Sequence, residues 1–119
     1  MGSRANITFY LQENTVRVWV GALKEIGEPA FIRFLVNAET MEMILQPYHR
    51  KDFQSFRVPK EVYEPNGKNY QSMRVHSIAF CQRLAARLGW DVQRSYRVPG
   101  TVLDEQKMVK FELKKAEEL

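Results

Sequence analysis

The sequence predicts an α+β fold with an antiparallel sheet, in which a β-α-β-β(-β) unit occurs twice. Two stretches begin alike, VRVWVGALKEIG at residues 16–27 and MRVHSIAFCQRL at residues 73–84. Arg17-Val18 and Arg74-Val75 stand 57 positions apart, and the same offset brings Ala22 onto Ala79. Segments with the apolar–polar alternation of strands follow each stretch. We expect one domain over residues 1–119, with units at about 15–59 and 72–113 and a linker at 60–71.

The elements of the first unit follow from local patterns. NITFYLQE is rich in β-branched and aromatic residues and adds a strand before the unit. In TVRVWV, valines alternate with Arg17 and Trp19, which is typical of a strand with one buried face. GALKEIGEP predicts a short helix that ends at Gly27 and Pro29. Further strands are expected at FIRFLVN (31–37), MEMILQPY (41–48) and SFRVP (55–59).

The second unit begins after the linker, KEVYEPNGKNYQ, which contains Pro-Asn-Gly and shows little apolar periodicity. SMRVH predicts a strand at residues 72–76. In SIAFCQRLAARLGW, apolar residues recur at helical spacing, with Ser77 as the N-cap and Gly89 as the stop. Two further strands are expected at RSYRVPG (94–100) and KMVKFEL (107–113).

Composition narrows the class of protein. The chain has 119 residues, a net charge of +4 and one cysteine, so neither an intrachain disulfide nor a four-cysteine zinc site can form. No apolar run approaches the roughly 20 residues of a membrane span. The N-terminus lacks the apolar core of a signal peptide, so we expect a cytoplasmic protein with no membrane partner.

Catalytic chemistry has few candidate residues. The histidines are His49 and His76, and Cys81 lies on the apolar side of its predicted helix. A Cys-His pair is one reading of Cys81, and a buried structural thiol is the reading that we favour. His49, Asp52 and His76 lack metal-ligand spacing, and no phosphate loop is present. We therefore expect no enzyme activity, cofactor, metal or small-molecule substrate.

Basic residues indicate nucleic acid as a partner. Arg83 and Arg87 stand four residues apart on the polar side of the second helix, and guanidinium groups suit phosphate oxygens. Lys24 on the first helix could act in the same way, and Arg74, Arg94 and Arg97 could extend the patch, depending on which strand faces they occupy. The hypothesis is sequence-independent binding of the DNA backbone. The alternative is an ordinary solvated helix face.

The order of elements over residues 15–113 resembles one domain of the DNA sliding clamps, the processivity-factor family. That resemblance implies two units related by a pseudo-two-fold axis, with the two helices side by side along a hole that holds DNA. Clamps use several domains in each ring, so the resemblance also implies that this chain self-associates.

Residues 7–48 are similar to a second family, the AbrB-type transcription regulators. The segment RVWVGALKEIGEPAFIRFLVNAETMEMILQP has that family's strand, short helix ending in Gly and hairpin, which implies DNA binding. A third hypothesis, from another class, is a protein–protein interaction or assembly module that uses exposed sheet edges.

Overall fold

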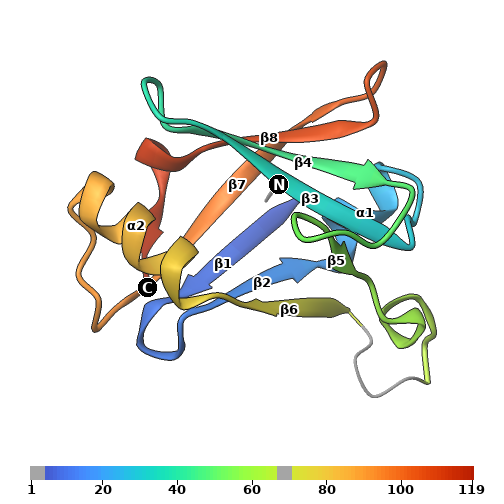
Figure 1. Ribbon diagram of the computed structural model, residues 1–119, viewed down its shortest axis with the longest axis horizontal. Helices are drawn as coiled ribbons and strands as arrows, with labels where there is room; N and C mark the ends of the chain where they lie inside the picture. Colours follow the sequence, from blue (N-terminus) through green and yellow to red (C-terminus); the bar gives the residue numbers. More distant parts are fainter. Residues whose placement is uncertain (1–4, 67–70) are drawn as a thin grey trace.

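The apolar–polar alternation of the strands separates the inside of a barrel from its outside. A computed structural model describes residues 5–66 and 71–119, and these form a nearly closed barrel of antiparallel strands (Figure 1). The strands follow the order β5-β3-β4-β8-β7-β1-β2-β6, and β9 also pairs with β7. The strands are β1 (Asn6–Tyr10), β2 (Thr15–Trp19), β3 (Phe31–Asn37), β4 (Glu42–Tyr48), β5 (Phe56–Arg57), β6 (Ser72–His76), β7 (Ser95–Leu103), β8 (Met108–Glu112) and β9 (Glu117–Glu118).

The long strand β7 joins the two walls of the barrel. It pairs with β1 over residues 95–99 and with β8 over residues 100–103. Gly100 stands where the strand changes partner. A Cβ atom there would lie 2.5 Å from the Ala5 carbonyl oxygen and 2.7 Å from Cε1 of Phe111. The crossing therefore requires glycine, because any side chain would collide with backbone as well as with core residues.

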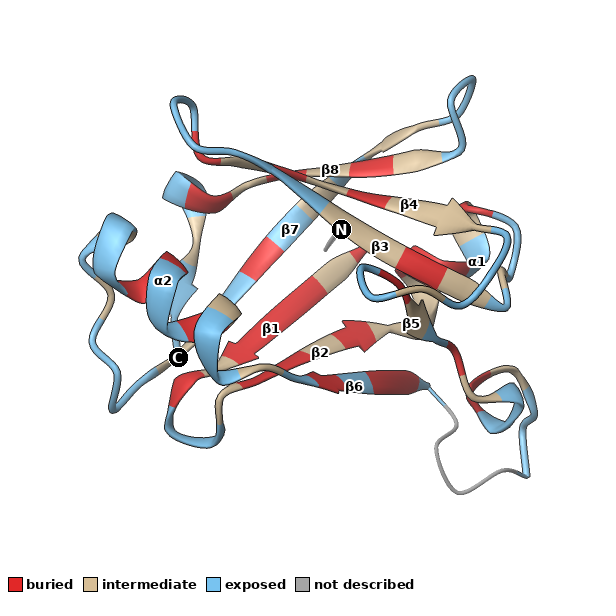
Figure 2. Ribbon diagram, in the orientation of Figure 1, coloured by how far each residue is buried: buried red, intermediate tan, exposed pale blue. Residues whose placement is uncertain are grey.

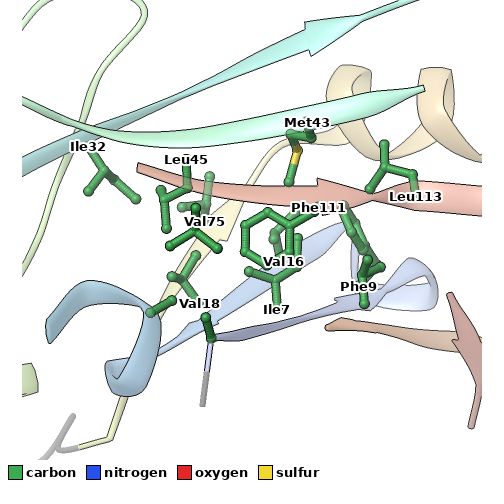
Figure 3. Close-up of a cluster of buried hydrophobic side chains, with 14 of the residues drawn as sticks. Ile7, Phe9, Val16, Val18, Ile32, Met43, Leu45, Val75, Phe111 and Leu113 are labelled. Carbon is green, nitrogen blue, oxygen red and sulfur yellow. The ribbon is translucent and has the colours of Figure 1, made fainter. Parts of the chain in front are cut away.

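The core fills the barrel from both walls. Ile7, Phe9, Val16 and Val18 project from β1 and β2 toward Met43, Leu45 and Phe111 of β4 and β8 (Figure 3). All seven side chains have an exposed fraction of 0%. The buried positions alternate with outward ones along the strands, and exposed residues gather at hairpin tips and on the second helix (Figure 2).

The two helices lie at opposite ends of β2 (Figure 1). Helix α1 (Val20–Glu25) follows directly from the last residue of β2. Helix α2 (Ile78–Leu88) begins beside the N-terminal end of β2, where the Ser77 amide donates to the Asn14 carbonyl at 2.9 Å. The Ser77 hydroxyl accepts from the Phe80 amide, and Gly89 ends the helix at a φ of 69°, so both predicted termini are confirmed. Neither helix is long and apolar enough to cross a membrane.

The predicted α+β, clamp-like repeat is wrong. Antiparallel strands are the largest class of regular structure and form one nearly closed barrel, and α1 and α2 are not side by side. The sequence pattern located β1 to β8 approximately, but it did not predict β9, the extension of β7 to Leu103 or the partners of the strands. β1, which the prediction placed outside the repeat, lies between β7 and β2 and helps to close the barrel.

Two local predictions also need correction. The strand expected at 55–59 shrinks to the two residues of β5, because Val58 and Pro59 lead into a 3-10 turn, η2 (Lys60–Tyr63). The strand expected at 6–13 ends at Tyr10, where a second 3-10 turn, η1 (Leu11–Glu13), begins. A third, η3 (Leu113–Lys115), separates β8 from β9. Residues 67–70 of the predicted linker lie outside the described residues.

Candidate nucleic-acid interface

Arg17 and Arg74 are direct partners across the β2–β6 ladder. Two backbone bonds fix the alternation of this ladder, from the Ser77 amide to Asn14 and from the Val20 amide to Gln71. Pairs with and without backbone hydrogen bonds alternate along an antiparallel ladder. The Arg17–Arg74 pair lies three positions from each of these two bonded pairs, so no backbone hydrogen bonds join its members. Such pairs hold their Cα atoms about 4.5 Å apart, so their side chains start from the closest spacing that a sheet offers.

Both arginines project from the outside of the barrel. Val16, Val18 and Val75, their neighbours along the two strands, are buried inside it. Arg74 is exposed and Arg17 is partly exposed. Neither forms an ion pair with a carboxylate of the described residues. Like charges placed directly opposite each other destabilise a sheet, so this pair has an unfavourable energy that an anion would relieve.

The Arg17 guanidinium is fixed in place. Its Nε donates to the Ser72 hydroxyl at 2.7 Å, and its Cζ lies 4.0 Å from the centre of the Trp19 ring. The Trp19 indole N–H in turn donates to the Thr8 hydroxyl at 3.1 Å. Within the described chain, the two terminal nitrogens of Arg17 have no acceptor. Four N–H donors on a fixed group therefore remain for a ligand.

A third arginine continues the row. Thr8 is paired with Arg17 on one side and with Arg97 on the other, so Arg97, Arg17 and Arg74 follow one line across the sheet. We call these three residues the arginine row. Arg97 already pairs with Glu117 of β9 at 2.7 Å. The uncompensated charge of the row is therefore at Arg17 and Arg74.

The other predicted residues are dispersed. Arg83 and Arg87 are both exposed on α2, and Arg87 donates to the Ala38 carbonyl at 2.8 Å. Arg94 follows α2, and its Nε lies 3.9 Å from Oδ2 of Asp91. Lys24 is exposed on α1, at the other end of the barrel (Figure 1). These residues therefore do not form the single patch with Arg74 that was expected. Arg74 and Arg97 instead share a row with Arg17, which was not predicted as a binding residue.

Arg17 was not predicted as a binding residue because the sequence of one strand does not show its register against the neighbouring strand. Alternation placed Arg17 on the polar face of its strand, but its neighbour depended on how β2 and β6 align. A usable signal was present. Arg17 and Arg74 occupy matching positions in two similar segments, and two such strands that pair antiparallel about their centres bring matching residues together.

Cys81 is a packed thiol. Its exposed fraction is 0%, and burial raises the pKa of the thiol to about 11. A thiol with that pKa stays protonated near neutral pH and is a poor nucleophile. His76 is exposed on β6, and within the described residues no hydrogen bond joins it to Cys81. In the described ranges, no three His, Cys, Asp or Glu side chains gather closely enough to hold a metal ion.

Comparison of the chain with family models, with curated proteins and with solved structures finds no match. The resemblance of residues 7–48 to the AbrB-type regulators and that of residues 15–113 to the sliding clamps thus rest on the sequence alone. A function for this chain has to be argued from its own geometry.

Proposed function

We propose that the protein is a non-enzymatic binding protein for the phosphate backbone of DNA. The observation that carries the proposal is the direct pairing of Arg17 with Arg74 on the outer wall of the barrel. Two arginines whose Cα atoms have the closest cross-strand spacing can direct their guanidinium groups to one phosphate group, which offers several acceptor oxygens and a negative charge.

Two features support the proposal: the guanidinium group of Arg17 is held in place, and the charges of Arg17 and Arg74 are not compensated within the described chain. Arg17 is held by Ser72 and Trp19 before any ligand arrives, so little side-chain freedom is lost when it binds. A phosphate between Arg17 and Arg74 would also turn a like-charge repulsion into two attractions. No neighbouring carboxylate within the described residues already does this for the pair.

The binding is independent of base sequence in this proposal. Base reading needs side chains that reach into a groove, usually from a helix or a ribbon. The arginine row lies across the outer face of the barrel, and the Trp19 ring next to it is covered by Arg17. Backbone contacts position a nucleic acid without reporting its sequence.

We extend the proposal to self-association in the cytoplasm. Among the described strands, β6 stands at one end of the strand order and pairs with β2 alone. A second copy paired against β6 would place its own arginine row beside the first, which would lengthen the surface for one DNA segment. Unpaired strand edges are common sites for such pairing.

The experiment compares two single charge reversals. Fluorescence anisotropy of a labelled random-sequence duplex is measured at low salt with the unmodified protein, Arg74→Glu and Lys107→Glu. Lys107 is exposed in the turn between β7 and β8, so its reversal changes the net charge equally at a site remote from β6. We expect Arg74→Glu to lose binding and Lys107→Glu to keep it. Equal effects of the two variants would show that only net charge matters and would reject the site.

A further inference from the structure

The outer half of β3 has an open edge. β4 pairs with β3 along its whole length, whereas β5 reaches only Phe31 and Ile32 on the other side. Residues 33–37 therefore lack a strand on that side in the described structure, and we call them the open edge. Exposure of β3 rises toward its end, from the buried Ile32 to Leu35 at 44% (Figure 2).

Backbone groups of Phe34 and Val36 face outward from this edge. The Ala30 carbonyl accepts from the Val58 amide on the β5 side, and the Asn37 carbonyl accepts from the Met41 amide on the β4 side. Because backbone groups alternate between the two sides of a strand, those of Phe34 and Val36 point to the same side as Ala30. Within the described chain these groups have no partner.

An aromatic groove of about 460 Å³ runs beside the open edge. It lies between β3, the loop before β5 and the first turns of α2. Phe34 stacks on Phe80 of α2 with ring centres 5.7 Å apart, and the Phe56 ring lies 6.0 Å from Phe34. The groove thus has an apolar floor whose rings already pack on one another.

Phe53 stands over this groove and is 94% exposed. The loop that carries it forms hydrogen bonds within itself. The Asp52 amide donates to the Ser55 hydroxyl at 2.8 Å, and the Gln54 amide donates to the Asp52 carboxylate at 2.8 Å. A large aromatic side chain presented to solvent by a bonded loop is typical of an interface anchor.

The charge of the groove is positive. Arg33 and Arg83 contribute to its lining, and no acidic side chain does so among the described residues. Arg83 is exposed and forms no ion pair in the described chain. An occupant with carboxylates would therefore be favoured over a neutral or basic one.

We infer that the open edge and its groove form a docking site for an extended, acidic segment of a partner protein. The segment adds to β3 as a further strand, which satisfies the outward backbone groups of Phe34 and Val36. Its apolar side chains meet Phe34, Phe53 and Phe80, and its carboxylates meet Arg83. The five residues of the open edge span about 17 Å, enough for a strand of ordinary length.

Backbone chemistry favours a peptide over the other occupants. The open edge presents N–H donors and C=O acceptors in alternation, and a peptide backbone supplies both complements. A phosphodiester has only acceptors, so the carbonyls of Phe34 and Val36 would repel it. A second copy docked by the same edge would bring Arg33 and Arg83 of the two copies together, which is a like-charge contact.

The test uses three pools of labelled eight-residue peptides. In the first pool, Glu alternates with Val, Ile, Phe or Tyr. The second has Lys in place of Glu, and the third carries the first pool's sequences with alternate amides N-methylated. We expect the first pool to bind in anisotropy measurements. The Lys pool and the N-methylated pool should each bind at least about tenfold more weakly.

Exposed residues of the protein supply the matching variants. Phe53→Ser should weaken the acidic pool about tenfold, and Arg83→Glu should reverse the preference between acidic and basic pools. Lys107→Glu, remote from the groove, should change neither. Absence of binding by the acidic pool, equal binding of acidic and basic pools, or unchanged binding after N-methylation would overturn the inference. A dimer or a DNA complex that Phe53→Ser disrupts would overturn it as well, in favour of that occupant.

Discussion

Arg17 and Arg74 face each other across the β2–β6 ladder and leave the barrel on the same outer face. Their Cα atoms share the closest spacing that antiparallel strands provide. Arg17 is fixed by Ser72 and Trp19, whereas Arg74 is exposed. This like-charge pair is unfavourable for the stability of the sheet, and unfavourable arrangements of this kind are expected at binding sites.

Removal of the like charge should stabilise the unliganded protein. Arg74→Gln is expected to raise the free energy of unfolding by about 0.2–1 kcal/mol at low salt, because the cross-strand repulsion disappears. The gain should shrink in high salt, where the repulsion is screened. Urea unfolding at two salt concentrations measures this, with Arg83→Gln on α2 as the control. A loss of stability in Arg74→Gln would contradict the like-charge description of the pair.

Gly100 should tolerate no side chain. Gly100→Ala would bring a methyl group to 2.5 Å from the Ala5 carbonyl oxygen and from Cγ1 of Val109. Such overpacking typically costs about 1–3 kcal/mol of unfolding free energy. The next residue, Thr101, is exposed, so Thr101→Ala is the matched control and should stay within about 0.5 kcal/mol. Urea unfolding of both variants measures these changes. Equal stabilities would mean that the packing around Gly100 of β7 is looser than described.

Cys81 should link stability to alkaline pH. Burial raises the pKa of its thiol from 9.0 to about 11, so the unfolded chain loses this proton first as the pH rises. The contribution of the thiol is fully present below pH 9 and is lost progressively between pH 9 and about 11. We expect the unmodified protein to lose more stability over this window than Cys81→Ala does.

A chemical probe provides an independent check on Cys81. A disulfide reagent at pH 8 should label the thiol only after urea unfolds the chain, because the side chain is buried. Rapid labelling of the folded protein would show that the thiol is accessible and would remove the basis for the pH effect.

Self-association should depend on the ligand. The like charges of two neighbouring arginine rows oppose pairing through β6, and a bound duplex would neutralise both rows. Light scattering of the protein over a range of concentrations, with and without a short duplex, should therefore show a larger assembly in the presence of DNA. A monomer mass under both conditions would reject pairing through β6 but would leave the binding site itself intact.

Local features of the fold were predictable from the sequence, and the partners of the strands were not. Ser77 and Gly89 mark the ends of α2 because capping depends on residues within one turn. The strand pattern of residues 31–37 likewise needed no distant information. The position of β1 between β7 and β2 did, because strand pairing is set by contacts far apart in the chain. For the same reason, Arg74 was predicted as a binding residue and its cross-strand partner Arg17 was not.

The salt dependence of DNA binding tests the central claim most directly. Each phosphate neutralised on a duplex contributes about −0.9 to the slope of log affinity against log salt concentration. With one phosphate held between Arg17 and Arg74, the unmodified protein should give a slope of about −0.9, and Arg74→Gln, which leaves Arg17 alone to hold the phosphate, should bind more weakly at every salt concentration. Lys107→Gln should keep the slope of the unmodified protein. Equal affinities of the unmodified protein and Arg74→Gln, a slope near zero, or no binding at low salt would contradict the account.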